Sequence, residues 1–225
     1  MMKAQALRLH GIGVAVLTAI AMAACATISN PLSEAELQSI RISGVDVRYA
    51  PEAEVYWPEA EQNYVAGVQA QSTRPVKAEA RVAAADITSG GGENSNSEYT
   101  QIAETPEARQ HLRDRVAAMV KAQAEKTLLP HFTGTRDTRL EVTVHGFNIP
   151  PAVQRVVLGG QPMLAAVTVL KDSATGKELA RLDRLAAGYA GNGLLGVALD
   201  QAGDDLHVRV LEAWGDQLRQ WLLKR

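Results

Sequence analysis

One thiol, a few histidines and one glycine-rich motif are the groups in this sequence whose chemistry could carry a function. Cys25 is the only cysteine in the chain, so no internal disulfide can form. In an exported protein a leftover thiol calls for an explanation. Acylation of the sulfur supplies one, because each buried methylene of a fatty chain contributes about 0.8 kcal/mol to membrane binding.

Residues 1–24 have the pattern of an export signal. Lys3 and Arg8 give a short basic region, and residues 11–24 form an apolar run without any charge. As a helix, at about 1.5 Å per residue, this run would reach only about 21 Å. A membrane-spanning helix needs roughly 20 apolar residues. The run therefore has the length of a signal-peptide core rather than of a permanent span.

The apolar run ends in Met22-Ala23-Ala24-Cys25, with small residues directly before the cysteine. This segment resembles the lipobox of bacterial lipoproteins, with Met22 in place of the usual Leu. The resemblance implies that Cys25 becomes the mature N-terminus and carries a diacylglyceryl group and an N-acyl chain. The next residue is Ala26 rather than Asp, which resembles lipoproteins delivered to the outer membrane. The alternative is an ordinary secretory signal with a stray cysteine near its cleavage site.

The glycine-rich motif lies at residues 191–196 and spells G-x-G-x-x-G. This spacing is typical of dinucleotide-binding loops. Such a loop works inside a βαβ unit whose second strand carries an acidic residue for the ribose. Here one helix follows the motif and ends the chain, and the acid at the right distance, Asp216, lies within that helix. We therefore expect a structural loop and no bound cofactor.

The histidines that remain after the signal show no paired metal-ligand spacing. They are His111, His131, His145 and His207. His111 and His207 are expected at the solvent edges of helices, and His145 could pair with Glu141 on one strand face. The sequence also lacks a G-x-S-x-G nucleophile elbow. We expect no metal site, no catalytic residue and no enzyme activity.

Two loops carry an unusual number of apolar residues and are candidates for contact with a partner or a membrane. The alternative is that both loops are tucked under helix ends. The candidate contact residues are Val156, Val157 and Leu158 in one loop and Leu194 and Leu195 in the other.

The composition is that of a globular protein. Removal of residues 1–24 from a chain of 225 leaves 201, enough for a domain with a real core. The formal net charge is −2, and the loss of Lys3 and Arg8 takes it to −4. The sequence contains no basic patch of the kind that would indicate nucleic acid as a partner. We expect a short lipidated tether over residues 25–36, followed by one domain over residues 37–225.

The first half of that domain is the harder part to interpret. Residues 37–50 are expected to form a strand with a β-bulge at Gly44, because the apolar alternation changes parity there; the alternative is two short strands that meet at a turn. Pro58, with acid in the following turn, indicates a helix start. Residues 88–100 are expected to form a flexible loop. Its Gly triplet resembles a phosphate cradle but lacks the following Lys-Ser/Thr.

The second half shows clear periodicity. Apolar residues at helical spacing predict helices over residues 105–129 and 204–224. Clean alternation predicts a strand over residues 138–147. Residues 162–171 are apolar on both faces and are expected to form a central strand, and residues 177–187 are expected to return as a strand after a turn at Asp172–Gly176. The expected fold class is α+β, with two layers: a mostly antiparallel sheet of about four strands packed by two amphipathic helices.

The order of elements from residue 138 to the C-terminus resembles a group of uncharacterised proteobacterial lipoproteins with a small α+β periplasmic domain. The resemblance rests on residues 140–147, 159–160, 172–176 and 214–222, and it implies no particular activity. The expectation is a lipid-anchored, non-enzymatic binding or envelope-assembly module whose partners are the membrane and an unknown envelope protein. The alternatives are a subunit of an oligomeric outer-membrane export or pore assembly, and an envelope hydrolase with a convergent polar pocket.

Overall fold

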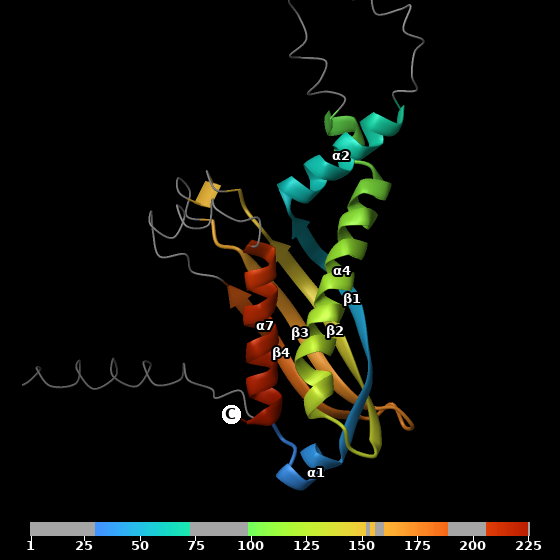
Figure 1. The fold of residues 1–225 in the computed structure, drawn as a ribbon, viewed down its shortest axis with the longest axis vertical. Coiled ribbons are helices and arrows are strands. Elements are labelled where there is room, and N and C mark those ends of the chain that lie inside the picture. Colours follow the sequence, from blue (N-terminus) through green and yellow to red (C-terminus); the bar gives the residue numbers. More distant parts are fainter. Residues whose placement is uncertain (1–29, 73–98, 152–153, 156–159, 189–205, 225) are drawn as a thin grey trace, which may run out of the picture.

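The computed structural model describes residues 30–72, 99–151, 154–155, 160–188 and 206–224. These residues form a four-stranded sheet with two long helices lying across one of its faces (Figure 1). The elements, in chain order, are α1 (Glu34–Ser39), β1 (Ile40–Tyr56), α2 (Pro58–Ser72), α4 (Pro106–Leu128), the 3-10 helix η2 (Leu129–His131), β2 (Arg136–Asn148), β3 (Met163–Asp172), β4 (Glu178–Gly188) and α7 (Leu206–Leu223).

The strands lie in the order β1-β2-β3-β4. β3 pairs with both β2 and β4 in antiparallel fashion, whereas β1 and β2 are parallel. Parallel neighbours need a crossover connection, and here that connection contains α2 and α4. The expected α+β class with a mostly antiparallel sheet is confirmed, as is the internal position of the strand at Met163–Asp172.

The bulge expected in the first strand is present. Ile42 pairs with Thr138 and Gly44 pairs with Arg139, so Ser43 is the extra residue. β1 also runs further than expected, to Tyr56, because a second irregularity between Tyr49 and Glu54 restores its pairing with β2. The strand therefore carries the chain along the whole length of the sheet.

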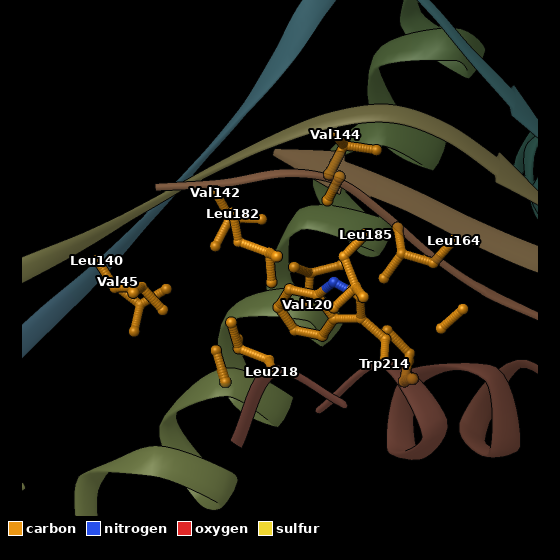
Figure 2. Packing of buried hydrophobic residues seen from close by; sticks show 14 of the residues in the cluster. Val45, Val120, Leu140, Val142, Val144, Leu164, Leu182, Leu185, Trp214 and Leu218 are labelled. Carbon is orange, nitrogen blue, oxygen red and sulfur yellow. The ribbon is translucent and has the colours of Figure 1, made fainter. Parts of the chain in front are cut away.

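The two long helices cover one face of the sheet, and their buried side chains pack against those of the strands to form the core. Thr105 caps α4, accepting a hydrogen bond from the Ala108 N–H at 3.1 Å. The buried residues of each helix recur at helical spacing, as expected from the sequence. Figure 2 shows Val120 of α4 and Trp214 of α7 together with buried side chains of the strands.

The other face of the sheet is open and carries paired charges. Arg41 and Asp137 lie 2.6 Å apart, and Arg139 and Asp46 lie 2.9 Å apart. Glu141 accepts from Lys171 at 2.8 Å. Exposed pairs of this kind contribute little to stability, but they make this a solvated face of balanced charge.

The turn between β3 and β4 is as expected. Gly176 has a φ of +69°, in the region that glycine adopts without strain. Asp172 ties the turn together by accepting from the N–H groups of Ala174 and Thr175 at 3.1 and 2.9 Å.

Two expectations in the first half of the chain need correction. Of the tether expected over residues 25–36, residues 30–36 belong to the folded domain instead, because Asn30 and Leu32 are buried and α1 begins at Glu34; residues 25–29 lie outside the described part. Of the loop expected over residues 88–100, Tyr99 and Thr100 are helical, and residues 88–98 lie outside the described part.

Candidate functional site

All of the predicted contact residues lie outside the described part of the chain. These are Cys25 and the apolar loop residues Val156, Val157, Leu158, Leu194 and Leu195, together with the glycine motif at 191–196. The described elements that flank these loops are β2, which ends at Asn148, β4, which ends at Gly188, and α7, which begins at Leu206. The structure leaves the contacts of the loop residues as predictions.

The first described residue of interest is Asn30, which joins the N-terminal segment to the C-terminal helix. Its side-chain N–H groups donate to the carbonyls of Leu222 at 3.0 Å and Trp221 at 3.5 Å. Its side-chain oxygen accepts from the Leu32 N–H at 3.0 Å. Carbonyls in the last turn of a helix lack their usual partners, and Asn30 supplies a donor to the Leu222 carbonyl and a second, longer contact to the Trp221 carbonyl, which also accepts from the Lys224 N–H. We call Asn30, Leu32, Trp221 and Leu222 the N-terminal junction.

The sequence after Asn30 holds this junction in place. Ser33 and Glu36 form a capping box: the Ser33 N–H donates to Glu36 at 2.8 Å, and the Ser33 hydroxyl accepts from the Glu36 N–H at 3.3 Å. Hydrogen bonds from Ser33 hold the pKa of Glu36 below its usual value. This Ser-x-x-Glu spacing is the signal that could have predicted α1.

A second feature is an open cleft of about 550 Å³ at the opposite end of the molecule, which we call the β1–α4 cleft. It lies where the end of β1, α2 and the start of α4 meet. Its walls carry glutamates and arginines, and apolar side chains from β1 and α4 complete it. The lining residues are Ala53, Glu54, Val55, Tyr56, Glu61, Tyr99, Thr100, Ala103, Glu104, Arg109, Leu112 and Arg113.

Arg113 is fixed at one side of the cleft by contacts with β1. Its guanidinium donates to the Ala53 carbonyl at 3.1 Å and lies 5.2 Å from the centre of the Tyr49 ring. The Tyr49 hydroxyl in turn donates to the Arg113 carbonyl at 2.7 Å. Burial raises the pKa of Tyr49, so this hydroxyl stays protonated.

Tyr99 is fixed in the same cleft by an acidic partner. Its hydroxyl donates to Glu61 at 2.7 Å, and burial followed by this hydrogen bond raises the pKa of Tyr99 to about 12. The Tyr99 hydroxyl therefore stays protonated near neutral pH. The cleft therefore offers hydrogen bonds and charges of both signs, which suits binding.

The pairing expected for His145 is wrong. Its Nδ1 lies 2.9 Å from Glu52 of β1, not near Glu141. Glu141 instead forms ion pairs with Lys171 at 2.8 Å and with Arg48 at 3.2 Å. The reason is the register of the sheet. Side chains of the neighbouring strand β1 lie closer to His145 than Glu141 does, which is four positions earlier on the same strand.

His207 also differs from expectation, because it is half-buried rather than at a solvent edge. Its ring lies 4.6 Å from the ring of Trp57, which is only 3% exposed. Phe147 packs on Trp57 at 5.8 Å, and the Arg115 guanidinium lies 4.8 Å from its ring. These contacts join the start of α2 to α4, α7 and β2. In the described residues, no three His, Cys, Asp or Glu side chains gather as metal ligands would.

Comparisons with known proteins give little further information. No family model matches the sequence, and no curated protein matches it. A solved structure described as a "putative lipoprotein" from Caulobacter crescentus CB15 is similar at 15% identity and a TM-score of 0.31, covering 48% of this chain and 80% of that one. A likeness at this level carries no argument about function. Of the helices that the structure describes, none has the length and apolar character to cross a membrane.

Proposed function

We propose that the protein is a lipid-anchored protein of the cell envelope whose folded body is a non-enzymatic binding module. The observation that carries the proposal is the apolar run ending in Met22-Ala23-Ala24-Cys25. The N-terminal junction supports it, because Asn30, only five positions after Cys25, is already part of the folded body. An anchor of two or more acyl chains would retain such a body stably at the bilayer.

The test of the anchor is the substitution Cys25→Ser. The native protein should partition into the detergent-rich phase of a detergent phase separation, because its acyl chains enter micelles. The variant should stay in the aqueous phase, or it should keep residues 1–24 uncleaved. Mass spectrometry of the N-terminal peptide should find acyl chains on Cys25. If both forms partition alike into the aqueous phase, the anchor is refuted.

The periplasmic face of the outer membrane is the location that we propose, from Ala26 directly after the cysteine. Separation of inner and outer membranes on a density gradient tests it. The Ala26→Asp variant is the matched control, since Asp at this position should retain the protein in the inner membrane. Equal distribution of both forms would contradict the outer-membrane assignment while leaving the anchor intact.

For the binding surface we propose the β1–α4 cleft, with a polypeptide segment of another envelope protein as its ligand. Tyr56 at the rim is 42% exposed, and exposed tyrosines are enriched at binding surfaces. Glu104 and Arg109 face the same space, so a segment with charges of both signs could pair with it.

A photo-crosslinking amino acid at position 56 tests this surface in living cells. It should give a discrete adduct with one envelope protein, and the added substitution Arg109→Glu should weaken that adduct. The matched control is position 129, also an exposed hydrophobic residue but at the other end of the molecule. The same adduct from both positions, or an adduct unaffected by Arg109→Glu, would contradict the assignment.

A further inference from the structure

The N-terminal junction restricts how far the body can move from its anchor. Only five residue steps separate Cys25 from Asn30. At full extension these steps span about 18 Å. Asn30 is 7% exposed and bonded to the last turn of α7, and Leu32 is 5% exposed in the core. The segment from Asn30 onward is therefore part of the folded body and cannot lengthen the tether.

Several elements meet at the end of the molecule that contains this junction. α1 leads directly into the start of β1, and Thr138, near the start of β2, pairs with Asp172 at the β3–β4 turn. Figure 1 shows α1, the C-terminal end of α7 and this turn at one end of the sheet, and α2 at the other. We call the first the anchored end and the second the distal end.

The two ends are further apart than the tether can reach. β1 has 17 residues and runs from α1 to the residue before Trp57. At about 3.3 Å per residue it would span up to about 55 Å. A tether of about 18 Å therefore cannot bring the distal end to the bilayer while the anchored end points away from it.

Nothing in the described surface would hold the body on its side. The open face of the sheet carries charges of both signs that pair with each other, such as Arg41 with Asp137. Such a face has neither the apolar area nor the excess of positive charge that binds lipid surfaces. The large hydrophobic residues that the described part exposes are Tyr56, Leu129 and Val208, and Leu129 lies in η2 at the anchored end.

We infer that the lipid bilayer is the neighbour of the anchored end, formed by α1, η2, the β3–β4 turn and the C-terminal end of α7. The distal end, with α2 and the β1–α4 cleft, projects away from the membrane toward its ligands. The inference rests on the proposed acylation of Cys25. It adds which surface of the body faces the lipid.

Energy transfer from labelled protein to labelled lipid tests this orientation. Ala174 in the β3–β4 turn and Gln62 in α2 are both exposed, so Ala174→Cys and Gln62→Cys each give one site for a donor dye in the acylated full chain. The proteins are bound to vesicles of phosphatidylethanolamine and phosphatidylglycerol with a trace of acceptor-labelled lipid. Transfer should be several-fold stronger from position 174 than from position 62.

Two controls separate the orientation from the anchor. With Cys25→Ser, neither label should transfer energy, because the protein is no longer on the vesicle. A long Gly/Ser segment inserted after Thr27 should keep the protein bound but reduce the difference between the labels, since such linkers are flexible. Equal transfer from both labels of the bound native protein would overturn the orientation alone. No transfer from either label would overturn the anchor and the orientation with it.

Discussion

Every polar atom of the Asn30 side chain has a partner, and this makes its replacement informative. Asn30→Ala should lower the free energy of unfolding by about 1–3 kcal/mol, because buried carbonyls of α7 lose their donor. Asn30→Asp should cost more at neutral pH. Its carboxylate cannot donate to Leu222, and negative charge is unfavourable at the C-terminal end of a helix. Urea denaturation of the mature chain carrying Cys25→Ser measures both variants.

The matched control for Asn30→Asp is Gln62→Glu, the same amide-to-acid change on the exposed surface of α2. It should change the free energy of unfolding by less than about 0.5 kcal/mol. A result in which Asn30→Asp is as stable as Asn30→Ala would mean that the side-chain N–H groups do not bond to α7.

Asp172 predicts a specific dependence of stability on pH. The hydrogen bond from Arg136, at 2.8 Å, and those from Thr175 lower its pKa from 3.8 to about 2. Because the folded protein favours the ionised form, the stabilisation is fully present above the ordinary pKa. It is lost as the pH falls through about 2. Asp172→Asn should therefore flatten the loss of thermal stability between about pH 4 and pH 2, and a melting series over that range measures it.

Asp183→Asn is the control for this pH series. The Asp183 side chain is 70% exposed and lies 3.5 Å from Arg181, so its replacement should leave the acid decline almost unchanged. An equal flattening by both variants would show that the contacts of Asp172 are not its cause.

At the scale of elements, Gly134 allows two segments to approach closely. It follows η2, and its N–H donates to the Ile40 carbonyl at 2.8 Å. A methyl group at this position would overlap the carbonyl of Ser39. Gly134→Ala should therefore force the backbone apart and lower the free energy of unfolding by about 1–3 kcal/mol, as overpacked sites do. Chemical denaturation measures the change.

Gly67 provides the matched control in an exposed helix. A methyl group there would meet nothing within 4 Å. Gly67→Ala should stabilise the protein by about 0.5–1 kcal/mol, because alanine loses less conformational entropy in a helix. If both alanine variants changed stability in the same direction, steric overlap would not explain the effect at Gly134.

The sequence was sufficient for elements that depend on local periodicity. The stripe of α4 and the alternation of β2 led to correct boundaries within a few residues, because burial of one face follows directly from spacing. The bulge at Gly44 could be predicted for the same reason. Residues 37–39 are predicted as the start of a strand but belong to α1, whose capping box at Ser33 and Glu36 is the local signal for a helix start.

The candidate sites could not be predicted, because each depends on residues far apart in the chain. The β1–α4 cleft combines segments near Glu54, Tyr99 and Arg109, and none of these has a motif of its own. Asn30 and Leu222 are 192 positions apart. The parallel pairing of β1 with β2, which sets the partner of His145, likewise follows from tertiary packing rather than from local pattern.

At the scale of the whole molecule, both edges of the sheet are irregular. At one edge, β1 has the extra residue Ser43 and contains Pro51. At the other, β4 departs from regular pairing between Leu182 and Leu185. Bulges and prolines on edge strands oppose pairing with another chain. These edges disfavour a ring or pore assembled by extension of the sheet.

The mature chain with Cys25→Ser should therefore be a monomer in solution. Size-exclusion chromatography with light scattering, over a series of protein concentrations, measures its mass. The expected mass is that of one chain at all concentrations. A stable ring of several copies would contradict this prediction and would favour the alternative of an oligomeric export or pore assembly.

The bond between Asn30 and Leu222 has a consequence for biogenesis. If the chain is exported from its N-terminus, Asn30 crosses the membrane early. The carbonyls that it bonds, those of Trp221 and Leu222, cross 191 and 192 positions later. If Cys25 carries the proposed anchor, its acylation can precede completion of the fold, and the chain would be held at the membrane before Asn30 meets α7. Any product truncated within the final turn of α7 would stay on the membrane with an unfastened leading segment. Such a product should be cleaved by added protease near Asn30 more readily than the full chain, in which Asn30 is buried against α7.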